Sequence, residues 1–270
     1  MKTIRSFLIV SILLASVVIQ SCGKVPVTGR NQLNLVPSSQ MLSMSYQQYD
    51  DFLKENKLST DVRKTTLVKE VGQRIQQAVE QYYQEKGISN QLEGYSWDFN
   101  LVDDDQVNAW CMPGGKVVIY TGILPVTRDE SGLAVVMGHE VAHAVAEHGN
   151  ERISQMLLTE LGGMALSVAL KEKPEQTQAM WMTAFGIGSQ LGVLLPYSRL
   201  HESEADHLGL IFMAMAGYDP HEAIRFWERM AAAKQGQAPP EFLSTHPSDD
   251  RRIRNITKLI PEAMKYYKPR

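Results

Sequence analysis

The chain has 270 residues, of which 44% are hydrophobic and 21% are charged, so it is long enough to bury a core and to form one or two domains. Its formal net charge is −3 and no stripe of basic residues is visible, which gives no electrostatic reason to expect a nucleic-acid partner. No internal repeat or low-complexity block is visible either.

The N-terminus has the pattern of an export signal. Two basic residues precede an apolar run over 7–19, which is too short for an easy membrane span and ends in small residues before Cys22. The segment 19–22, Ile-Gln-Ser-Cys, resembles a bacterial lipobox, so we expect residues 1–21 to be removed and Cys22 to carry lipid. Because Gln20 is not the usual residue at its place, cleavage by an ordinary signal peptidase is the alternative.

The second cysteine, Cys111, then has no partner for an intrachain disulfide. It lies in a predicted strand, and we interpret it as a buried small hydrophobe rather than a thiol with a chemical role. The segment 22–37 contains two prolines and a glycine without a regular period, which predicts a tether ahead of a domain covering 38–270.

The first part of that domain is predicted to be helical. Ser38 or Ser39 can cap a helix that extends through Phe52. A longer helix opens at Thr60, carries apolar residues at helical spacing, and ends at Gly87.

Three short strands follow the helices. Apolar and polar residues alternate over 95–101, which predicts a half-buried strand. A strand over 107–112 leads through Pro-Gly-Gly into another over 116–120. Together they predict a small antiparallel sheet.

A further helix is predicted over 128–148. Thr127 and Glu130 match a capping box ahead of an apolar run. Gly132 and Gly138 weaken this helix intrinsically, and close packing against the sheet would explain why they are tolerated.

The middle of this helix carries the sequence H-E-x-x-H. Residues four apart share a helix face, so His139 and His143 can direct both imidazoles at one metal ion. The pair suits Zn²⁺, and Glu140 is placed to accept a proton from a metal-bound water. A chance match on a core helix is the alternative. His148, nine residues after His139, lies near the opposite face and is interpreted as a surface residue or as one that supports the ligands.

Residues 161–195 are apolar and rich in glycine, with a polar interruption over 171–178. They predict a helical hairpin that is either buried or lies against a membrane surface. A lid over the catalytic cleft is one role that such a hairpin could have.

A second helix offers the third ligand. Ser198 can cap it, and Glu202 and Asp206, four residues apart, share one face. Glu202 can ligate zinc while Asp206 accepts an N–H from a ligating imidazole, that of His139. Glu204 lies about 200° around the helix from Glu202 and should point away. An exposed charged face is the alternative, disfavoured because the flanking residues are apolar.

The combination of H-E-x-x-H with a later E-x-x-x-D resembles the zinc metallopeptidases that include the CAAX prenyl endopeptidase and the mitochondrial Oma-type stress protease. The chain looks most similar to their bacterial envelope quality-control relatives. The likeness covers about 22–255, and Cys111 departs from the family pattern. Further matching segments are 27–33, Asn108-Ala109-Trp110 with 113–115 and 120–122, 196–199, and 245–247 with Arg252 and Ile253.

The resemblance implies an α+β, mainly helical, zincin-like (gluzincin) fold with the small antiparallel sheet packed on the active-site helices. It implies one Zn²⁺ per chain, held by His139, His143 and Glu202. Glu140 would be the base that takes a proton from the attacking water and returns it to the leaving amine. Asp206 would orient a ligating imidazole.

The same resemblance assigns roles outside the ligand helices. Asn108, Ala109 and Trp110 would form the edge strand that binds an extended substrate. His246 and Arg252 would stabilise the oxyanion. In some relatives the matching histidine instead reaches the zinc and keeps the enzyme latent, and a structural histidine before proline is a third reading.

The implied function is hydrolysis of peptide bonds in unfolded or misassembled cell-envelope proteins. Lipid on Cys22 would anchor the protein at the periplasmic face of the outer membrane, since Gly23 is not an inner-membrane retention residue. A zinc-containing envelope chaperone or assembly factor with latent proteolysis is the competing hypothesis. A structural lipoprotein with a fortuitous motif would bind no zinc.

Overall fold

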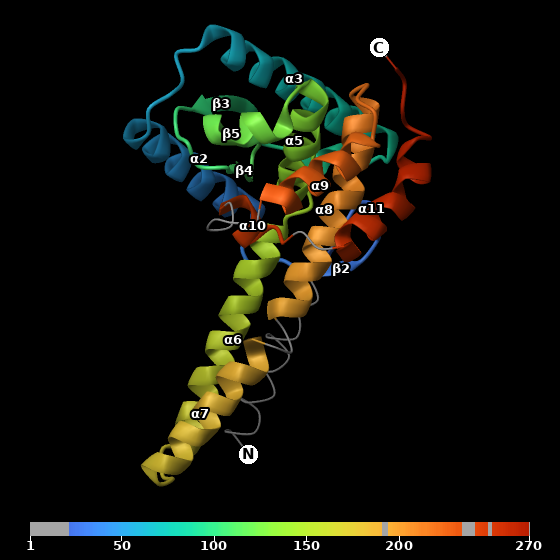
Figure 1. Ribbon diagram of the computed structural model, residues 1–270. Coiled ribbons are helices and arrows are strands. Elements are labelled where there is room, and N and C mark those ends of the chain that lie inside the picture. Colours follow the sequence, from blue (N-terminus) through green and yellow to red (C-terminus); the bar gives the residue numbers. More distant parts are fainter. Residues whose placement is uncertain (1–21, 191–193, 234–240, 248–249, 270) are drawn as a thin grey trace. The chain divides into compact units, whose positions relative to one another are not determined.

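The computed structural model describes residues 22–190, 194–233, 241–247 and 250–269 (Figure 1). The expected signal over 1–21 lies outside these residues. The described chain forms two compact units. The hairpin unit comprises the described residues of Met1–Ser38 and Glu147–Leu200, and the large unit comprises those of Ser39–Ala146 and His201–Arg270.

The hairpin unit begins with two short strands, β1 (Cys22–Lys24) and β2 (Asn31–Leu33), paired antiparallel. The Arg30 guanidinium donates to both carboxylate oxygens of Glu151 at 2.7 Å, which joins this segment to the helix α6 (His148–Leu170). The Leu35 N–H adds a bond to the Ser154 hydroxyl at 2.8 Å. The segment 22–37, expected to be a tether, therefore has regular structure bound to α6.

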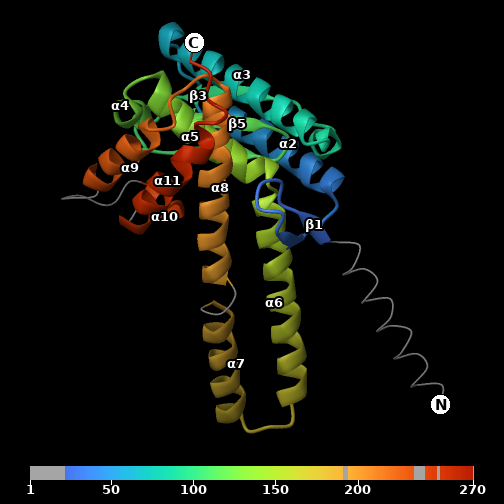
Figure 2. The ribbon, with the colours of Figure 1, turned by 90° about the vertical axis from the view of Figure 1, so that its right-hand side faces the viewer.

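Helices α6 and α7 (Glu175–Ser189) form the predicted hairpin and lie side by side in both views (Figures 1 and 2). They meet where Gly162 and Gly163 face the Phe185 ring. The hairpin starts at His148 rather than at 161, because Glu147 adopts a left-handed conformation (φ 55°) that ends the preceding helix. Of the two expected settings, burial is wrong, since most of the large apolar side chains of the hairpin are exposed, and the setting against a membrane surface stays a prediction.

The large unit opens with the two expected helices, α2 (Ser38–Glu55), whose first residue belongs to the other unit, and α3 (Val62–Glu85). The start of α3 differs from the prediction by a residue or two. Asp61, not Thr60, is its N-cap and accepts a hydrogen bond from the Lys64 N–H at 3.0 Å. Gly87 follows its C-terminus with φ 69°, as the sequence predicted.

The sheet contains β3 (Asp98–Val102), β4 (Ala109–Met112) and β5 (Lys116–Tyr120) in the order β3-β5-β4. Strands β4 and β5 form a hairpin, with Gly114 and Gly115 at positive φ in the turn. Strand β3 runs parallel to β5, so the prediction of a wholly antiparallel sheet is wrong. Residues 103–108 carry the chain across to the far side of β5, which leaves β4 at an edge.

Short helical turns, η1 (Ser89–Leu92), η2 (Thr121–Ile123) and α4 (Leu124–Thr127), flank the sheet. The helix α5 (Glu130–Val145) packs on β4 and α3. Its N-cap is Asp129, which accepts from the Gly132 N–H at 3.0 Å. The predicted cap, Thr127, is the last residue of α4 and instead donates its hydroxyl to the Leu124 carbonyl.

The other helices of the large unit are the 201–215 part of α8 (Leu195–Met215), α9 (Glu222–Ala233), α10 (Glu241–Thr245) and α11 (Asp250–Ala263). Helices α5 and α8 cross with their backbones in contact. A Cβ atom at Gly138 would lie 2.9 Å from the Gly209 carbonyl oxygen. Gly138 therefore packs against α8, and the prediction that it packs against the sheet is wrong.

Candidate metal centre

The two histidines of α5 and the first carboxylate of α8 converge. The Nε2 atoms of His139 and His143 are 3.2 Å apart. Glu202 places Oε1 3.2 Å from the His143 Nε2 and Oε2 3.4 Å from the His139 Nε2. The convergence of these three residues was predicted from helical spacing, and the structure confirms it.

His246 joins the same cluster from the short segment after α10. Its Nδ1 lies 3.1 Å from the His139 Nε2 and 3.0 Å from each carboxylate oxygen of Glu202. The family resemblance implied that His246 is an oxyanion donor or a fourth metal ligand, and a structural histidine before proline was the third reading. Its position among the donor atoms matches the second of these roles.

The donor set fits a zinc ion. The four ligand atoms lie within 4.8 Å of one another, and this is the single such group among the described residues. Tetrahedral zinc with bonds near 2.0–2.1 Å keeps its ligand atoms roughly 3.3 Å apart. Five of the six pairs of side chains make contacts of 3.0–3.4 Å, close to that edge length. Three imidazoles and one carboxylate are also the ligand types that zinc prefers.

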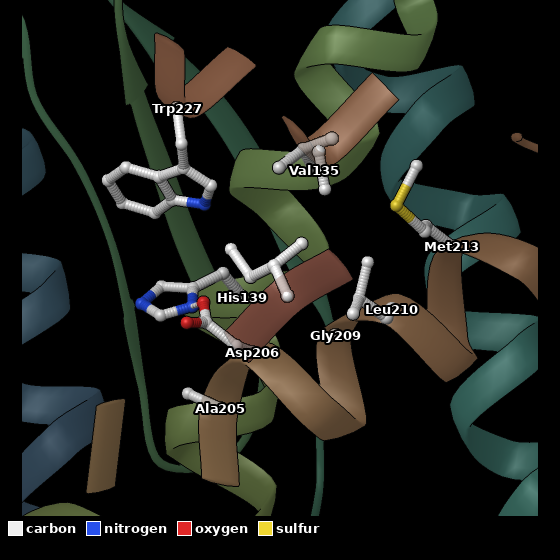
Figure 3. Close-up of a pocket in the computed structure, with 10 residues that line it drawn as sticks. Val135, His139, Ala205, Asp206, Gly209, Leu210, Met213 and Trp227 are labelled. Carbon is white, nitrogen blue, oxygen red and sulfur yellow. Dashed lines mark ion pairs between the residues drawn. The ribbon is translucent and has the colours of Figure 1, made fainter. Parts of the chain in front are cut away.

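Asp206 lies behind the ligands, as expected from its position four residues after Glu202. Its Oδ1 is 3.0 Å from the His139 Nδ1, so it can fix the tautomer in which Nε2 faces the metal. Figure 3 shows this pair beside Trp227 around a small cavity of about 10 Å³, which is room for about one water molecule. The mostly apolar lining keeps bulk water away from the contact.

Arg252 contacts two acidic side chains of the site, Asp206 and Glu202. Its Nε and Nη2 donate to Asp206 at 2.9 and 2.7 Å, and its Nη1 lies 3.1 Å from the Glu202 Oε2. Its guanidinium stacks 3.5 Å above the Trp227 ring. Trp227 is a site residue that the sequence did not reveal, since an aromatic residue on an amphipathic helix is normally a core residue.

These contacts shift the pKa values of the metal-free site. Burial opposes protonation of His139, but hydrogen bonds to Asp206 and Glu202 prevail and raise its pKa to about 9. Burial also opposes ionisation of Glu202, yet hydrogen bonds from the three histidines hold its pKa well below its usual range. For Asp206, burial opposes ionisation, but the Arg252 charge and the contact with His139 together prevail and lower the pKa.

Glu140 differs from the other acids of the site. It is buried, its Oε1 has no hydrogen-bond partner among the described residues, and that atom lies 3.4 Å from the His246 Nε2. Burial raises its pKa above the usual value. A buried acceptor atom beside the ligand cluster is where a proton-transferring base is needed. Glu204, predicted to point away from the cluster, is also buried and is not one of its four members.

The strand β4 is the expected substrate-binding edge. It is one of the two outer strands of the sheet and packs on α5. The Trp110 ring packs edge-on against Phe52 with centroids 4.9 Å apart, so it faces α2. Cys111, the next residue of the strand, points to the other face of the sheet. Burial, and after it the charge of Glu140, raises the pKa of the Cys111 thiol. A raised pKa agrees with its interpretation as an inert small residue.

A helix-borne pair of histidines, a glutamate from a second helix and a buried glutamate between the histidines define an active site of the zinc metallopeptidase class. A family model described as Peptidase family M48 matches residues 70–260, and the chain belongs to this family. The resemblance seen in the sequence, the α+β and mainly helical class, and the zincin-like fold are confirmed at this level.

The relatives include mitochondrial and bacterial proteases. The chain is 36% identical to the mitochondrial metalloendopeptidase OMA1 of Saccharomyces cerevisiae over 70% of this chain and 54% of the relative. It is 32% identical to the mitochondrial metalloendopeptidase OMA1 of Homo sapiens over 89% of this chain and 46% of the relative. It is 29% identical to the beta-barrel assembly-enhancing protease of Escherichia coli, over 57% and 32%.

Identity is thus higher to these mitochondrial proteins than to the bacterial one, the opposite of the order that the motifs suggested. The chain spans about half the length, or less, of these three relatives.

Proposed function

We propose that the chain is a zinc-dependent endopeptidase. The observation that carries the proposal is the convergence of His139, His143 and Glu202 beside the buried carboxylate of Glu140, whose Oε1 has no hydrogen-bond partner among the described residues. When bound, zinc supplies Lewis acidity that polarises a peptide carbonyl and lowers the pKa of a water molecule. Glu140 takes the proton from the attacking water and returns it to the leaving amine, a role that its raised pKa suits.

The substrate lies along the free edge of β4. An extended peptide would add a strand by main-chain hydrogen bonds to the 109–112 segment, with Asn108 at its start. The Phe242 N–H donates to the Val107 carbonyl at 3.1 Å, which limits pairing before that point. Backbone pairing selects an extended chain rather than a sequence, so unfolded or misassembled envelope proteins are the proposed substrates.

The proposed location is the periplasmic face of the outer membrane, with lipid on Cys22 as the anchor. The support is the lipobox-like 19–22 segment. The expected domain, 38–270, and the removal of 1–21 belong to the same proposal.

His246 is proposed to hold the site latent. Its Nδ1 lies where a fourth zinc ligand would, and this is the place that a catalytic site keeps for water. Oxyanion stabilisation would then require His246 to leave the cluster. For Arg252, the contacts with Asp206 and Glu202 favour positioning of these acids over direct stabilisation of the oxyanion.

Cleavage of casein by the mature chain tests the proposal. We expect activity that a chelator removes and that zinc restores, and we expect His246→Ala to raise the rate while zinc stays bound to the remaining ligands. A loss of activity in His246→Ala with zinc retained would instead support the oxyanion role. The closed set of four donors favours one competing function, an envelope chaperone, which would suppress aggregation without cleaving casein in either variant.

A further inference from the structure

The α6 helix carries an apolar stripe that no described residue of its own unit covers. Leu157, Leu161, Met164 and Val168 are 40%, 56%, 57% and 74% exposed. Their spacing of four, three and four residues places them on one helix face. The contact with α7 uses the opposite side of α6, where Gly162 and Gly163 meet Phe185. The stripe is therefore not part of the packing of the hairpin.

The second helix repeats this arrangement. Met180, Ala184 and Ile187 are exposed and recur at helical spacing on α7. Trp181, beside them, is 51% exposed, and tryptophan is enriched where a membrane meets water. Exposed apolar surface that extends over two helices is unusual for a soluble monomer and marks an interaction surface.

The composition of the hairpin points to lipid. By length and composition α6 is able to cross a membrane, and it is the one such helix among the described residues. Only 11% of its apolar window is buried, so it is not a core helix, and it lies far from the N-terminus, so it is not a signal sequence.

The hairpin does not reach across a bilayer, however. The first turns of α6 carry buried polar groups, among them Asn150, Glu151 and Ser154, that bind the β1–β2 segment. The exposed apolar part starts at Met156 and ends at Leu170, which is roughly 22 Å of helix against a hydrocarbon core of about 30 Å. The exposed charges of the 171–175 loop would then lie inside the core, at about 2.5–3.5 kcal/mol for each residue.

We propose that the α6–α7 hairpin docks on a lipid bilayer, lying along the interface with its apolar stripes in the acyl layer and its charged loop among the headgroups. Amphipathic helices bind membranes in this way. The base of the hairpin binds Arg30, the residue before β2, through the Arg30–Glu151 ion pair, and β2 pairs with β1, which begins at Cys22. Lipid on Cys22, which belongs to the proposed function, would therefore hold the hairpin beside the bilayer.

The test is a depth measurement on the full chain. A bimane fluorophore is placed at Val168→Cys in a Cys111→Ser background, and the protein is reconstituted in vesicles of phosphatidylethanolamine and phosphatidylglycerol that contain a lipid with a nitroxide on its acyl chain. The Cys111→Ser protein without an introduced cysteine measures any label on Cys22, and its signal is subtracted. The matched control is Gln77→Cys, an exposed position on α3. We expect several-fold stronger quenching at position 168 than at position 77.

Equal quenching at the two positions overturns the proposal, even if lipid on Cys22 keeps the protein on the vesicle. Crosslinking of Val168→Cys between two chains, without quenching, also overturns it and assigns the stripe to a second copy. Casein cleavage is measured on the same samples, so failure of the docking is distinguished from failure of the proposed peptidase.

Discussion

Glu140 and Glu202 are buried carboxylates of one site with opposite pKa shifts. Burial dominates at Glu140 and raises its pKa. At Glu202, hydrogen bonds from His139, His143 and His246 outweigh burial and lower it. Opposite shifts of this kind indicate different roles for the two acids. The acid with the higher pKa, Glu140, suits proton transfer, and the acid with the lower pKa, Glu202, suits binding of a cation.

The separation of roles predicts the effect of Glu140→Gln. The amide keeps the size of the side chain but accepts no proton at neutral pH, so the rate of casein cleavage should fall by about 10²–10⁴-fold. Zinc content should stay that of the wild-type protein, because Glu140 is not among the four clustered donors. Metal analysis beside the protease assay checks both statements, and near wild-type cleavage would remove Glu140 as the base.

The raised pKa of His139 predicts a proton release on zinc binding. Its pKa rises from 6.5 to about 9, so the metal-free imidazole is charged at pH 7. This charge stabilises the metal-free fold below about pH 6.5, and the contribution is lost as the pH rises through about 9. Zinc binds only the neutral ring, and its uptake at pH 7 should release about one proton.

Titration calorimetry in buffers with different ionisation enthalpies measures this proton. The apparent heat of zinc binding should vary with the buffer at pH 7 and vary less above pH 9. Identical heats in all buffers at pH 7 would mean that His139 is neutral before the metal binds.

At the scale of elements, the crossing of α5 and α8 determines where the ligands meet. A Cβ at Gly209 would lie 2.9 Å from the backbone nitrogen of His139. Backbone atoms cannot move out of the way by a change of side-chain rotamer. Gly209→Ala should separate the helices at a cost of about 1–3 kcal/mol in the free energy of unfolding and should weaken zinc binding.

Gly186→Ala on α7 is the matched control, because no heavy atom lies within 4 Å of the Cβ that it adds. This variant should be as stable as the wild-type protein or gain up to about 1 kcal/mol from helix propensity. Urea unfolding followed by circular dichroism compares the two. A Gly209→Ala protein as stable as the control would show that the two helices have room at their crossing.

What the sequence predicted at this scale was local. His139 and His143 are one helix turn apart on α5, and Glu202 and Asp206 are one turn apart on α8. The structure brings these side chains together as the two spacings predicted. The parallel pairing of β3 with β5 depends on the path of 103–108 across the sheet, which no periodicity records. Thr127 and Asp129 both fit an N-cap, and only the structure shows that the second one accepts the Gly132 N–H.

The remaining differences from the prediction have the same cause, which is contact between residues far apart in the sequence. The strands β1 and β2 have three residues each, too few to show alternation, and the Arg30–Glu151 pair that orders them joins residues 121 positions apart. His246 reaches Glu202 from 44 positions away, and only a family resemblance placed it near the metal.

For the whole molecule, the four residues of the ligand cluster all belong to the large unit, and none of them comes from the described residues of the hairpin unit. Zinc that binds only the folded state stabilises it by RT ln(1 + [Zn]/Kd), about 2.7 kcal/mol at a hundred times Kd. That stabilisation should be confined to the elements that meet at the site, because unfolding of one compact unit need not open the other.

Hydrogen exchange with and without a chelator measures where the stabilisation lies. Zinc should slow exchange in α5, in the 201–215 part of α8 and in the described part of 242–252, while the amides of α6 and α7 beyond Met156 exchange at unchanged rates. Glu202→Ala should abolish the difference between the zinc-bound and chelated samples, because it removes the one carboxylate of the ligand cluster. Equal protection of the hairpin by zinc would instead mean that both units unfold together in one cooperative transition. The large, metal-binding unit and the hairpin unit would then not differ in their stabilisation by zinc.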